Sequence, residues 1–209
     1  MKFKNIICIL FDLDGVLIDG QPLQVKSTIE VLKNYTQCTN EVKLLVNETI
    51  TTKEKLQILN SKGLIKKKDI NKIYSQKIKL FEKIALKKIK CTNRVLNMFK
   101  KLNQENFKVG VVTNSNGKTA IKILKKLKIF KFLDILISNS NKIKPKPNPE
   151  PYNLAMAKLK AKKKNTLIFE DSPVGILSAK RSGANYYKIR NLNKLNFNFL
   201  TKIIKFNHE

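Results

Sequence analysis

The chain has 209 residues, 42% of them hydrophobic, and a formal net charge of +28 at pH 7. This length suggests one domain or two small ones, and no apolar run approaches the ~20 residues that span a bilayer, which excludes a membrane-spanning protein. The only histidine is His208, and the three cysteines, Cys8, Cys38 and Cys91, lie far apart. Serine–histidine and cysteine–histidine mechanisms are therefore excluded, and neither a disulfide framework nor a zinc site is indicated. Acid–base chemistry near neutral pH must use carboxylates or a lysine.

The positive charge comes almost entirely from lysine, since the only arginines are Arg94, Arg181 and Arg190. A charge of this size is typical of proteins that bind polyanions. Arginine, however, is the residue favoured for bidentate recognition of phosphates and bases. Because lysine, asparagine and isoleucine dominate together and share A/T-rich codons, we favour compositional drift over dedicated nucleic-acid binding. Whether the charge reflects drift or nucleic-acid binding, the positive electrostatic field of the protein should attract anionic substrates and make their association salt-sensitive.

The first predicted element is a buried strand, Ile6–Phe11, because this unbroken run is rich in β-branched and aromatic residues. The run is short and leads straight into Asp12 without a signal-peptide cleavage site, so we expect a cytoplasmic protein. Asp12 and Asp14 should project to the same side at the carboxyl end of the strand, where open α/β sheets bind ligands. Carboxylates this close repel each other unless a cation lies between them or one keeps its proton. Two solvated acids at a strand end are the alternative interpretation.

Helical patterning dominates from about Leu23 to about Lys90. Ile70, Ile73 and Phe81, for example, recur on one face of a lysine-rich amphipathic segment. We therefore predict an all-α domain at residues 20–89, inserted after the first strand into an α/β core made of residues 1–19 and 90–209.

From Thr92 onward, predicted strands alternate with predicted helices. Thr92 and Asn93 are suited to cap a helix. Strands are predicted at Phe107–Val112, Leu133–Ile137, Thr166–Phe169 and Tyr186–Ile189, and helices at Tyr152–Leu159, Val174–Ser182 and Leu195–Ile204. This alternation predicts the α/β class, with a Rossmann-like parallel sheet covered by helices on both faces.

Polar clusters follow four of the predicted strands, and the carboxyl ends of parallel strands share one edge of the sheet. The clusters are Asp12 with Asp14, Thr113 with Asn114, Lys144, and Glu170 with Asp171. Clustered carboxylates without histidine or cysteine suit a hard cation such as Mg²⁺, whereas the hydroxyl, the amide and the lysine suit a phosphate group. A carboxylate nucleophile beside a carboxylic acid is a known route for covalent phosphoryl transfer.

Four motifs in this order resemble the haloacid dehalogenase superfamily. They are FDLDGVLID (Phe11–Asp19), VVTNS (Val111–Ser115), KPKPNPEPY (Lys144–Tyr152) and FEDSPVGILSAKRSGA (Phe169–Ala184). The chain is most similar to the β-phosphoglucomutase-like and phosphoglycolate-phosphatase-like branch, in which a helical cap follows the first strand. The resemblance covers essentially the whole chain.

The resemblance implies that Asp12 is the nucleophile that forms an aspartyl-phosphate. It implies that Asp14 first protonates the leaving alcohol and then activates water. Mg²⁺ would be held by Asp12, the backbone carbonyl of Asp14, and Asp171, with Glu170 as a nearby carboxylate. Alternatively, Glu170 could simply cap the following helix.

The same resemblance assigns the phosphate contacts to Thr113, to the backbone amide of Asn114, and to a lysine that bridges Asp12 and the phosphate. Thr113 could instead merely end a strand. Lys144 and Lys146 compete for the role of the lysine, and Lys144 is preferred because it precedes the first proline of the motif.

The cap decides the substrate in this family. Where mutases carry a histidine after Asp19, this chain has Gln24, and residues 46–51 lack their substrate-binding arginine unless a lysine such as Lys53 or Lys55 replaces it. We therefore expect a phosphatase that acts on a small phosphorylated metabolite, as a monomer or weak dimer. The alternatives are a sugar-phosphate mutase of the β-phosphoglucomutase type and a basic, nucleic-acid-directed phosphatase or binder.

Overall fold

A computed structural model describes residues 3–204, so His208 lies outside the described residues. The chain divides into two compact units, one formed by Met1–Asp19 with Ile89–Glu209 and the other by Gly20–Lys88. The second boundary therefore falls one residue earlier than the predicted end of the inserted domain. Within residues 3–204 no helix is long and apolar enough to cross a membrane.

The first unit is built on a parallel sheet of five strands in the order β3-β2-β1-β4-β5. The strands are β1 (Cys8–Phe11), β2 (Lys108–Val112), β3 (Ile135–Ile137), β4 (Thr166–Glu170) and β5 (Asn185–Lys188). The strand β1 is central, and its Leu10 pairs with Gly110 on one side and Ile168 on the other. The continuous apolar run that predicted a buried strand is thus explained by neighbours on both edges and both faces.

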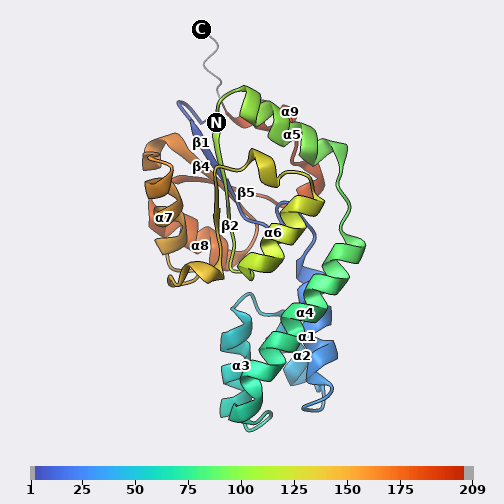
Figure 1. Ribbon diagram of the computed structural model, residues 1–209. Helices are drawn as coiled ribbons and strands as arrows, with labels where there is room; N and C mark the ends of the chain where they lie inside the picture. The colour runs from blue at the N-terminus through green and yellow to red at the C-terminus, as the bar shows by residue number, and fades with distance from the viewer. Residues whose placement is uncertain (1–2, 205–209) are drawn as a thin grey trace. The chain divides into compact units, whose positions relative to one another are not determined.

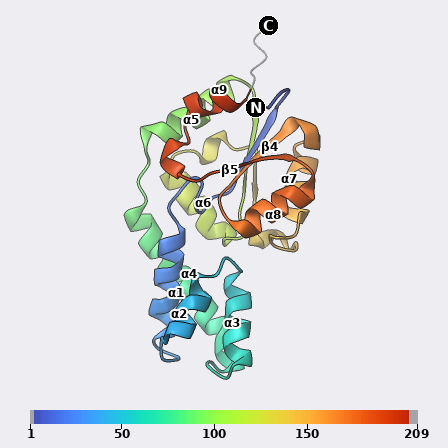
Figure 2. The same ribbon diagram turned by 180° about the vertical axis from the view of Figure 1, so that it is seen from behind.

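Helices cover both faces of this sheet, as Figures 1 and 2 show from opposite sides. The helices are α5 (Asn93–Gln104), α6 (Gly117–Lys126), α7 (Glu150–Lys158), α8 (Pro173–Ser182) and α9 (Phe197–Ile203). On the face covered by α7 and α8, Leu10, Val112 and Ile168 belong to one buried cluster with Tyr152. On the other face Phe11 stacks on Phe169 and touches Phe99 of α5. The predicted α/β class with a parallel sheet is confirmed.

The helix cap and several element boundaries predicted from the sequence are found in the structure. The hydroxyl of Thr92 accepts a hydrogen bond from the amide of Val95 and caps α5, as predicted. The predicted bounds of the strands and of α7, α8 and α9 agree with the observed ones to within two residues. Short 3₁₀ turns complete the described chain: η1 (Lys67–Asp69), η2 (Phe130–Phe132), η3 (Asn139–Asn141), η4 (Lys163–Asn165) and η5 (Leu192–Lys194).

The second unit is entirely helical in its regular structure. Its helices are α1 (Gln21–Leu32), α2 (Asn40–Asn47), α3 (Thr52–Ser61) and α4 (Ile70–Lys88). Helix α4 packs against α1 and α3, and the unit has a hydrophobic core of its own that includes Leu32, Leu56 and Ile73. Thr51 and Glu54 form a capping box at the start of α3.

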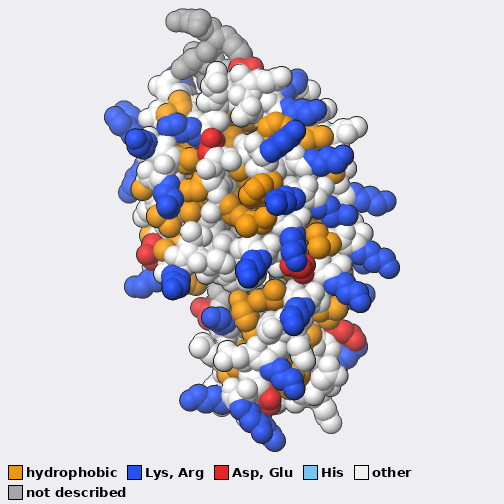
Figure 3. Space-filling view, in the orientation of Figure 1, with side chains coloured by type: hydrophobic (Ala, Val, Ile, Leu, Met, Phe, Trp, Pro, Cys, Tyr) orange, Lys and Arg blue, Asp and Glu red, His pale blue; other side chains and the backbone are white. Residues whose placement is uncertain are grey.

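Lysine side chains are scattered over the visible face of the molecule rather than gathered on one element (Figure 3). The cysteines Cys8, Cys38 and Cys91 are all free thiols. Burial of Cys8 inside β1 raises the pKa of its thiol to about 11, so this cysteine is protonated at neutral pH.

Candidate active site

The two aspartates of the first motif follow β1 in a tight turn. The amide of Asp12 donates to the carbonyl of Phe169 at 3.0 Å, and the amide of Gly15 donates to the carbonyl of Ile18 at 2.6 Å. Gly15 has a φ of +95°, and a Cβ at this position would lie 2.0 Å from Oδ2 of Asp171. Only glycine satisfies both conditions, so the turn brings the first and last motifs of the site into contact.

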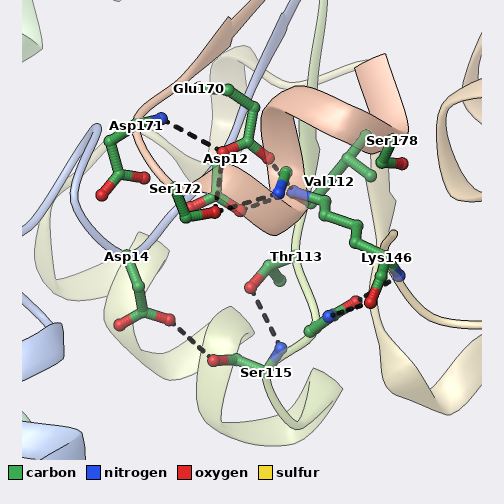
Figure 4. A network of polar contacts seen from close by, with 12 residues as sticks. Asp12, Asp14, Val112, Thr113, Ser115, Lys146, Glu170, Asp171, Ser172 and Ser178 are labelled. Atoms are coloured by element: carbon green, nitrogen blue, oxygen red, sulfur yellow. Dashed lines mark hydrogen bonds and ion pairs between the residues drawn. The ribbon is translucent and has the colours of Figure 1, made fainter. Parts of the chain in front are cut away.

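Lys146 is the centre of the site. Its side chain is 4% exposed, and its Nζ donates to Asp12 Oδ1 at 2.6 Å, to Glu170 Oε1 at 2.6 Å and to the carbonyl of Val112 at 2.7 Å (Figure 4). These three hydrogen bonds use all three N–H groups of the ammonium. The lysine therefore ties together the ends of β1, β2 and β4.

Lys144 does not take this place, and the prediction that it bridges to Asp12 is wrong. Lys144 is exposed, and its backbone amide donates to Glu150 at 3.0 Å. The side chain of Asn114 holds the backbone of Lys146 instead, through hydrogen bonds of 3.0 Å and 3.2 Å. The position of the first proline in the motif does not identify the lysine that contacts Asp12, because contacts of the lysine segment with the loop that carries Asn114 favour burial of Lys146.

Glu170, the last residue of β4, is fully buried and receives donors on both oxygens. Oε1 accepts from Lys146 and from the hydroxyl of Tyr152, each at 2.6 Å, and Oε2 accepts from the amide of Asp171 at 3.2 Å. The alternative role as a helix cap belongs to Ser172, whose hydroxyl accepts from the amide of Gly175 at 3.0 Å. Sequence reasoning missed Tyr152, although it is the last residue of the KPKPNPEPY motif.

Asp14 lies at the same edge but has a different partner from Asp12 (Figure 4). Its Oδ2 accepts a hydrogen bond from the hydroxyl of Ser115 at 2.7 Å. The backbone amide of Ser115 in turn donates to Oγ1 of the buried Thr113 at 3.0 Å. The structure therefore places Thr113 and Asn114 in the loop that carries the partner of Asp14. Ser115 was not predicted, although it belongs to the VVTNS motif.

Burial dominates the ionisation of the site. It raises the pKa of Asp12 well above its ordinary value even though Lys146 opposes the shift, and it raises the pKa of Asp171 to about 6 with help from Glu170. Burial alone would lower the pKa of Lys146, but Asp12 and Glu170 together raise it. The ammonium is therefore charged at neutral pH and lies between the carboxyl groups of Asp12 and Glu170.

Three carboxyl groups gathered beside one ammonium suit a further cation. Asp12, Glu170 and Asp171 each offer a carboxylate oxygen, and these three atoms lie within 4.8 Å of one another. Oδ1 of Asp171 is buried and has no hydrogen-bond partner in the described part of the chain. An unpartnered carboxylate oxygen in a set of oxygen donors fits a hard divalent metal ion. The donors on Glu170 leave Asp12 and Asp171 better suited than Glu170 to bind a metal directly.

The helical unit contains two buried lysines. Lys55 donates to the carbonyl of Val46 at 2.6 Å, near the end of α2. Lys77 of α4 donates to the side chains of Gln24 and Thr52, the latter at 3.1 Å. Of the two lysines considered earlier as phosphate anchors, Lys55 is thus engaged by a backbone carbonyl, and Lys53 is exposed near the ring of Tyr74.

Comparisons with known proteins agree with this geometry. Residues 9–189 match the family model described as haloacid dehalogenase-like hydrolase. PpaX of Clostridium perfringens, provisionally named a pyrophosphatase, is 31% identical over 181 residues, covering 84% of this chain and 80% of that protein. The phosphorylated carbohydrates phosphatase of Thermotoga maritima is 26% identical over 178 residues, covering 84% and 81%.

Solved structures show the same architecture. A family IA hydrolase of this class from Entamoeba histolytica superimposes with a TM-score of 0.76 at 27% identity, covering 95% of this chain and 89% of that one. The β-phosphoglucomutase of Clostridium difficile superimposes with a TM-score of 0.77 at 18% identity, covering 94% and 96%, which shows a common fold. The four motifs, the geometry of the strand ends and the family match together show that this chain belongs to the haloacid dehalogenase-like hydrolases.

Proposed function

We propose that the protein is a Mg²⁺-dependent phosphatase that hydrolyses a small organic phosphate monoester through an aspartyl-phosphate on Asp12. The observation that carries the proposal is the contact of a buried lysine ammonium with the first of two neighbouring aspartates. Asp12 is paired with the ammonium of Lys146, whereas Asp14 is bound by the neutral hydroxyl of Ser115. The ammonium of Lys146 favours the ionised form of Asp12, the form that attacks phosphorus, and so opposes the effect of burial.

In the first step a carboxylate oxygen of Asp12 attacks phosphorus, and the bond from phosphorus to the ester oxygen breaks. The departing alkoxide takes the proton of Asp14. In the second step Asp14 removes a proton from water, the water oxygen attacks phosphorus, and the bond to Asp12 breaks. Both steps balance, and Asp14 ends as it began.

Charge on the phosphoryl oxygens is the main obstacle in both steps. Lys146 offsets this charge, and the hydroxyl of Thr113 and the amide of Asn114 are proposed to donate to the phosphoryl group. Asp12, Asp171 and the backbone carbonyl of Asp14 would hold Mg²⁺, which adds positive charge at the phosphate when bound. Glu170 acts through Lys146, because its oxygens are engaged by that lysine, Tyr152 and the amide of Asp171.

The relatives and the helical unit support the proposed substrate class. The curated relatives carry the names of a phosphatase of phosphorylated carbohydrates and of a pyrophosphatase. Gln24, at the position of the mutase histidine, favours hydrolysis over phosphate transfer to a second hydroxyl. The basic side chains scattered over the face seen in Figure 3 should raise the local concentration of any small anion.

The test is hydrolysis of a panel that contains sugar phosphates, phosphoglycolate, pyrophosphate and a phosphorylated oligonucleotide, with and without Mg²⁺. Asp12→Asn should abolish hydrolysis, while Asp69→Asn, an acid-to-amide change in the helical unit, should leave it unchanged. Retained activity in Asp12→Asn would refute the mechanism. Including β-glucose 1-phosphate and following phosphorus NMR distinguishes free phosphate from a 6-phosphate product, which would instead indicate a mutase. A steep dependence of oligonucleotide turnover on salt would support the nucleic-acid alternative.

A further inference from the structure

The hydroxyl of Tyr152 belongs to the polar network of the site, and the proposed mechanism does not use it. Tyr152 lies on α7 and is fully buried. Its ring packs in the cluster beneath the sheet with Leu10 and Ile168, while its hydroxyl donates to Glu170 Oε1 at 2.6 Å. A tyrosine in an apolar core needs only its ring for packing, so this short hydrogen bond to a charged group calls for a separate explanation.

The same ring also faces the catalytic lysine. Nζ of Lys146 lies 4.8 Å from the centroid of the Tyr152 ring. The three N–H groups of this ammonium are used by Asp12, Glu170 and the carbonyl of Val112. Tyr152 therefore touches both members of the Glu170–Lys146 pair, one through its hydroxyl and the other through its ring face.

Oε1 of Glu170 accepts hydrogen bonds from both Lys146 and Tyr152, and this sharing affects how closely Lys146 is held to Asp12. Lys146 has two carboxylate partners at equal distances of 2.6 Å, Asp12 and Glu170. A hydrogen bond from Tyr152 withdraws charge from Oε1 and fixes where this oxygen lies. Without this donor, the ammonium would be attracted more strongly to Glu170 and held less closely on Asp12.

We propose that Tyr152 is a positioning residue, whose hydroxyl holds Glu170 so that Lys146 stays on the nucleophile Asp12. This inference rests on the proposed function, because it assigns the hydroxyl a role in aligning the attacking carboxylate. It acts through two intervening side chains and needs no contact between Tyr152 and the substrate.

Tyr152→Phe removes only the hydroxyl and keeps the ring. We expect formation of the aspartyl-phosphate in a single turnover, trapped by acid quench, to slow about tenfold, and kcat to fall with it, while KM stays within about twofold. Tyr186→Phe is the matched control, because Tyr186 packs against the same cluster from β5 but lies outside the polar network. A purely structural role would lower the melting temperature of Tyr152→Phe without changing the rate of phosphorylation per folded molecule.

A double-mutant cycle with Glu170→Gln tests the route through which the hydroxyl acts. If Tyr152 acts through Glu170, the double variant should phosphorylate no more slowly than Glu170→Gln alone. Additive losses, or equal phosphorylation rates for Tyr152→Phe and Tyr186→Phe, would overturn the inference. The Asp12→Asn variant separates this failure from that of the proposed function, since activity in Asp12→Asn would refute the mechanism itself, whatever Tyr152 does.

Discussion

Replacing Lys146 by methionine keeps the length of the side chain and removes its charge and its three N–H donors. The neighbouring Lys144→Met makes the same chemical change two residues away, on an exposed side chain. The two variants therefore compare the lysine that the structure places on Asp12 with the lysine that the order of the motif favoured.

The magnitude follows from burial. Lys146 is 4% exposed and pairs with two carboxylates whose side chains are 11% and 0% exposed. Removing one partner of a buried ion pair costs about 3–5 kcal/mol, because the remaining charge stays in a low-dielectric environment. At about 2–4 °C per kcal/mol for a chain of this size, the melting temperature of Lys146→Met should fall by roughly 6–20 °C. Lys144→Met should stay within about 0.5 kcal/mol of the wild type, as exposed substitutions usually do.

Activity should separate the two variants further. Loss of one preorganised group that stabilises transition-state charge lowers kcat by about 10²–10³, so Lys146→Met should lose at least this factor on the best substrate of the panel. The assay is steady-state phosphate release at a temperature where both variants are folded, as shown by circular dichroism. Comparable losses in the two variants, or a larger loss in Lys144→Met, would refute the assignment of Lys146.

Three further measurements test other parts of the structure. Gly15→Ala should abolish activity and weaken Mg²⁺ binding measured by calorimetry, because the added Cβ would lie 2.0 Å from Asp171 Oδ2. Gly63 is the control, since it also has a positive φ but no atom lies within 4 Å of a Cβ added there. Gly63→Ala should therefore only lower stability. Since the pKa of Asp171 is raised to about 6, protonation should compete with the metal, and Mg²⁺ affinity should fall up to about tenfold per pH unit below pH 6; a constant affinity between pH 7 and pH 5 would contradict this. Without metal, the same raised pKa means that the folded state binds a proton at Asp171 before the unfolded chain does, so the contribution of Asp171 to the unfolding free energy should increase as the pH falls from 6 toward 4. Burial lowers the pKa of Lys55 to about 8, because the folded state disfavours its charged form. As the pH rises from 7 to 9.5, the folded state therefore loses this proton before the unfolded chain does, and the unfolding free energy of the wild type should rise relative to that of Lys55→Met. Urea titrations measure this difference.

The fold was predictable from the sequence because its signals are local. An unbroken apolar run such as that leading to Phe11 identifies a strand buried on both faces, and strands that alternate with helices must form a parallel sheet. Since the carboxyl ends of such strands share one edge, Asp12, Thr113 and Glu170 could be placed together without coordinates. The clustering of acids without histidine then indicated phosphoryl transfer with a hard cation.

The choice between partners at that edge needed the tertiary structure. Lys144 and Lys146 each precede a proline, and the side chain of Asn114, 32 residues from Lys146, holds the backbone of the lysine that is buried against Asp12. The sequence did not single out Tyr152, because the partner of its hydroxyl, Glu170, lies 18 residues away on β4. The sequence by itself determined the class of fold, the edge of the sheet and the chemical groups available there. The tertiary structure decided which of these groups are in contact, through burial and through hydrogen bonds between distant segments. Burial and hydrogen bonds set the energy of each charge, and they produce no periodic pattern in the sequence.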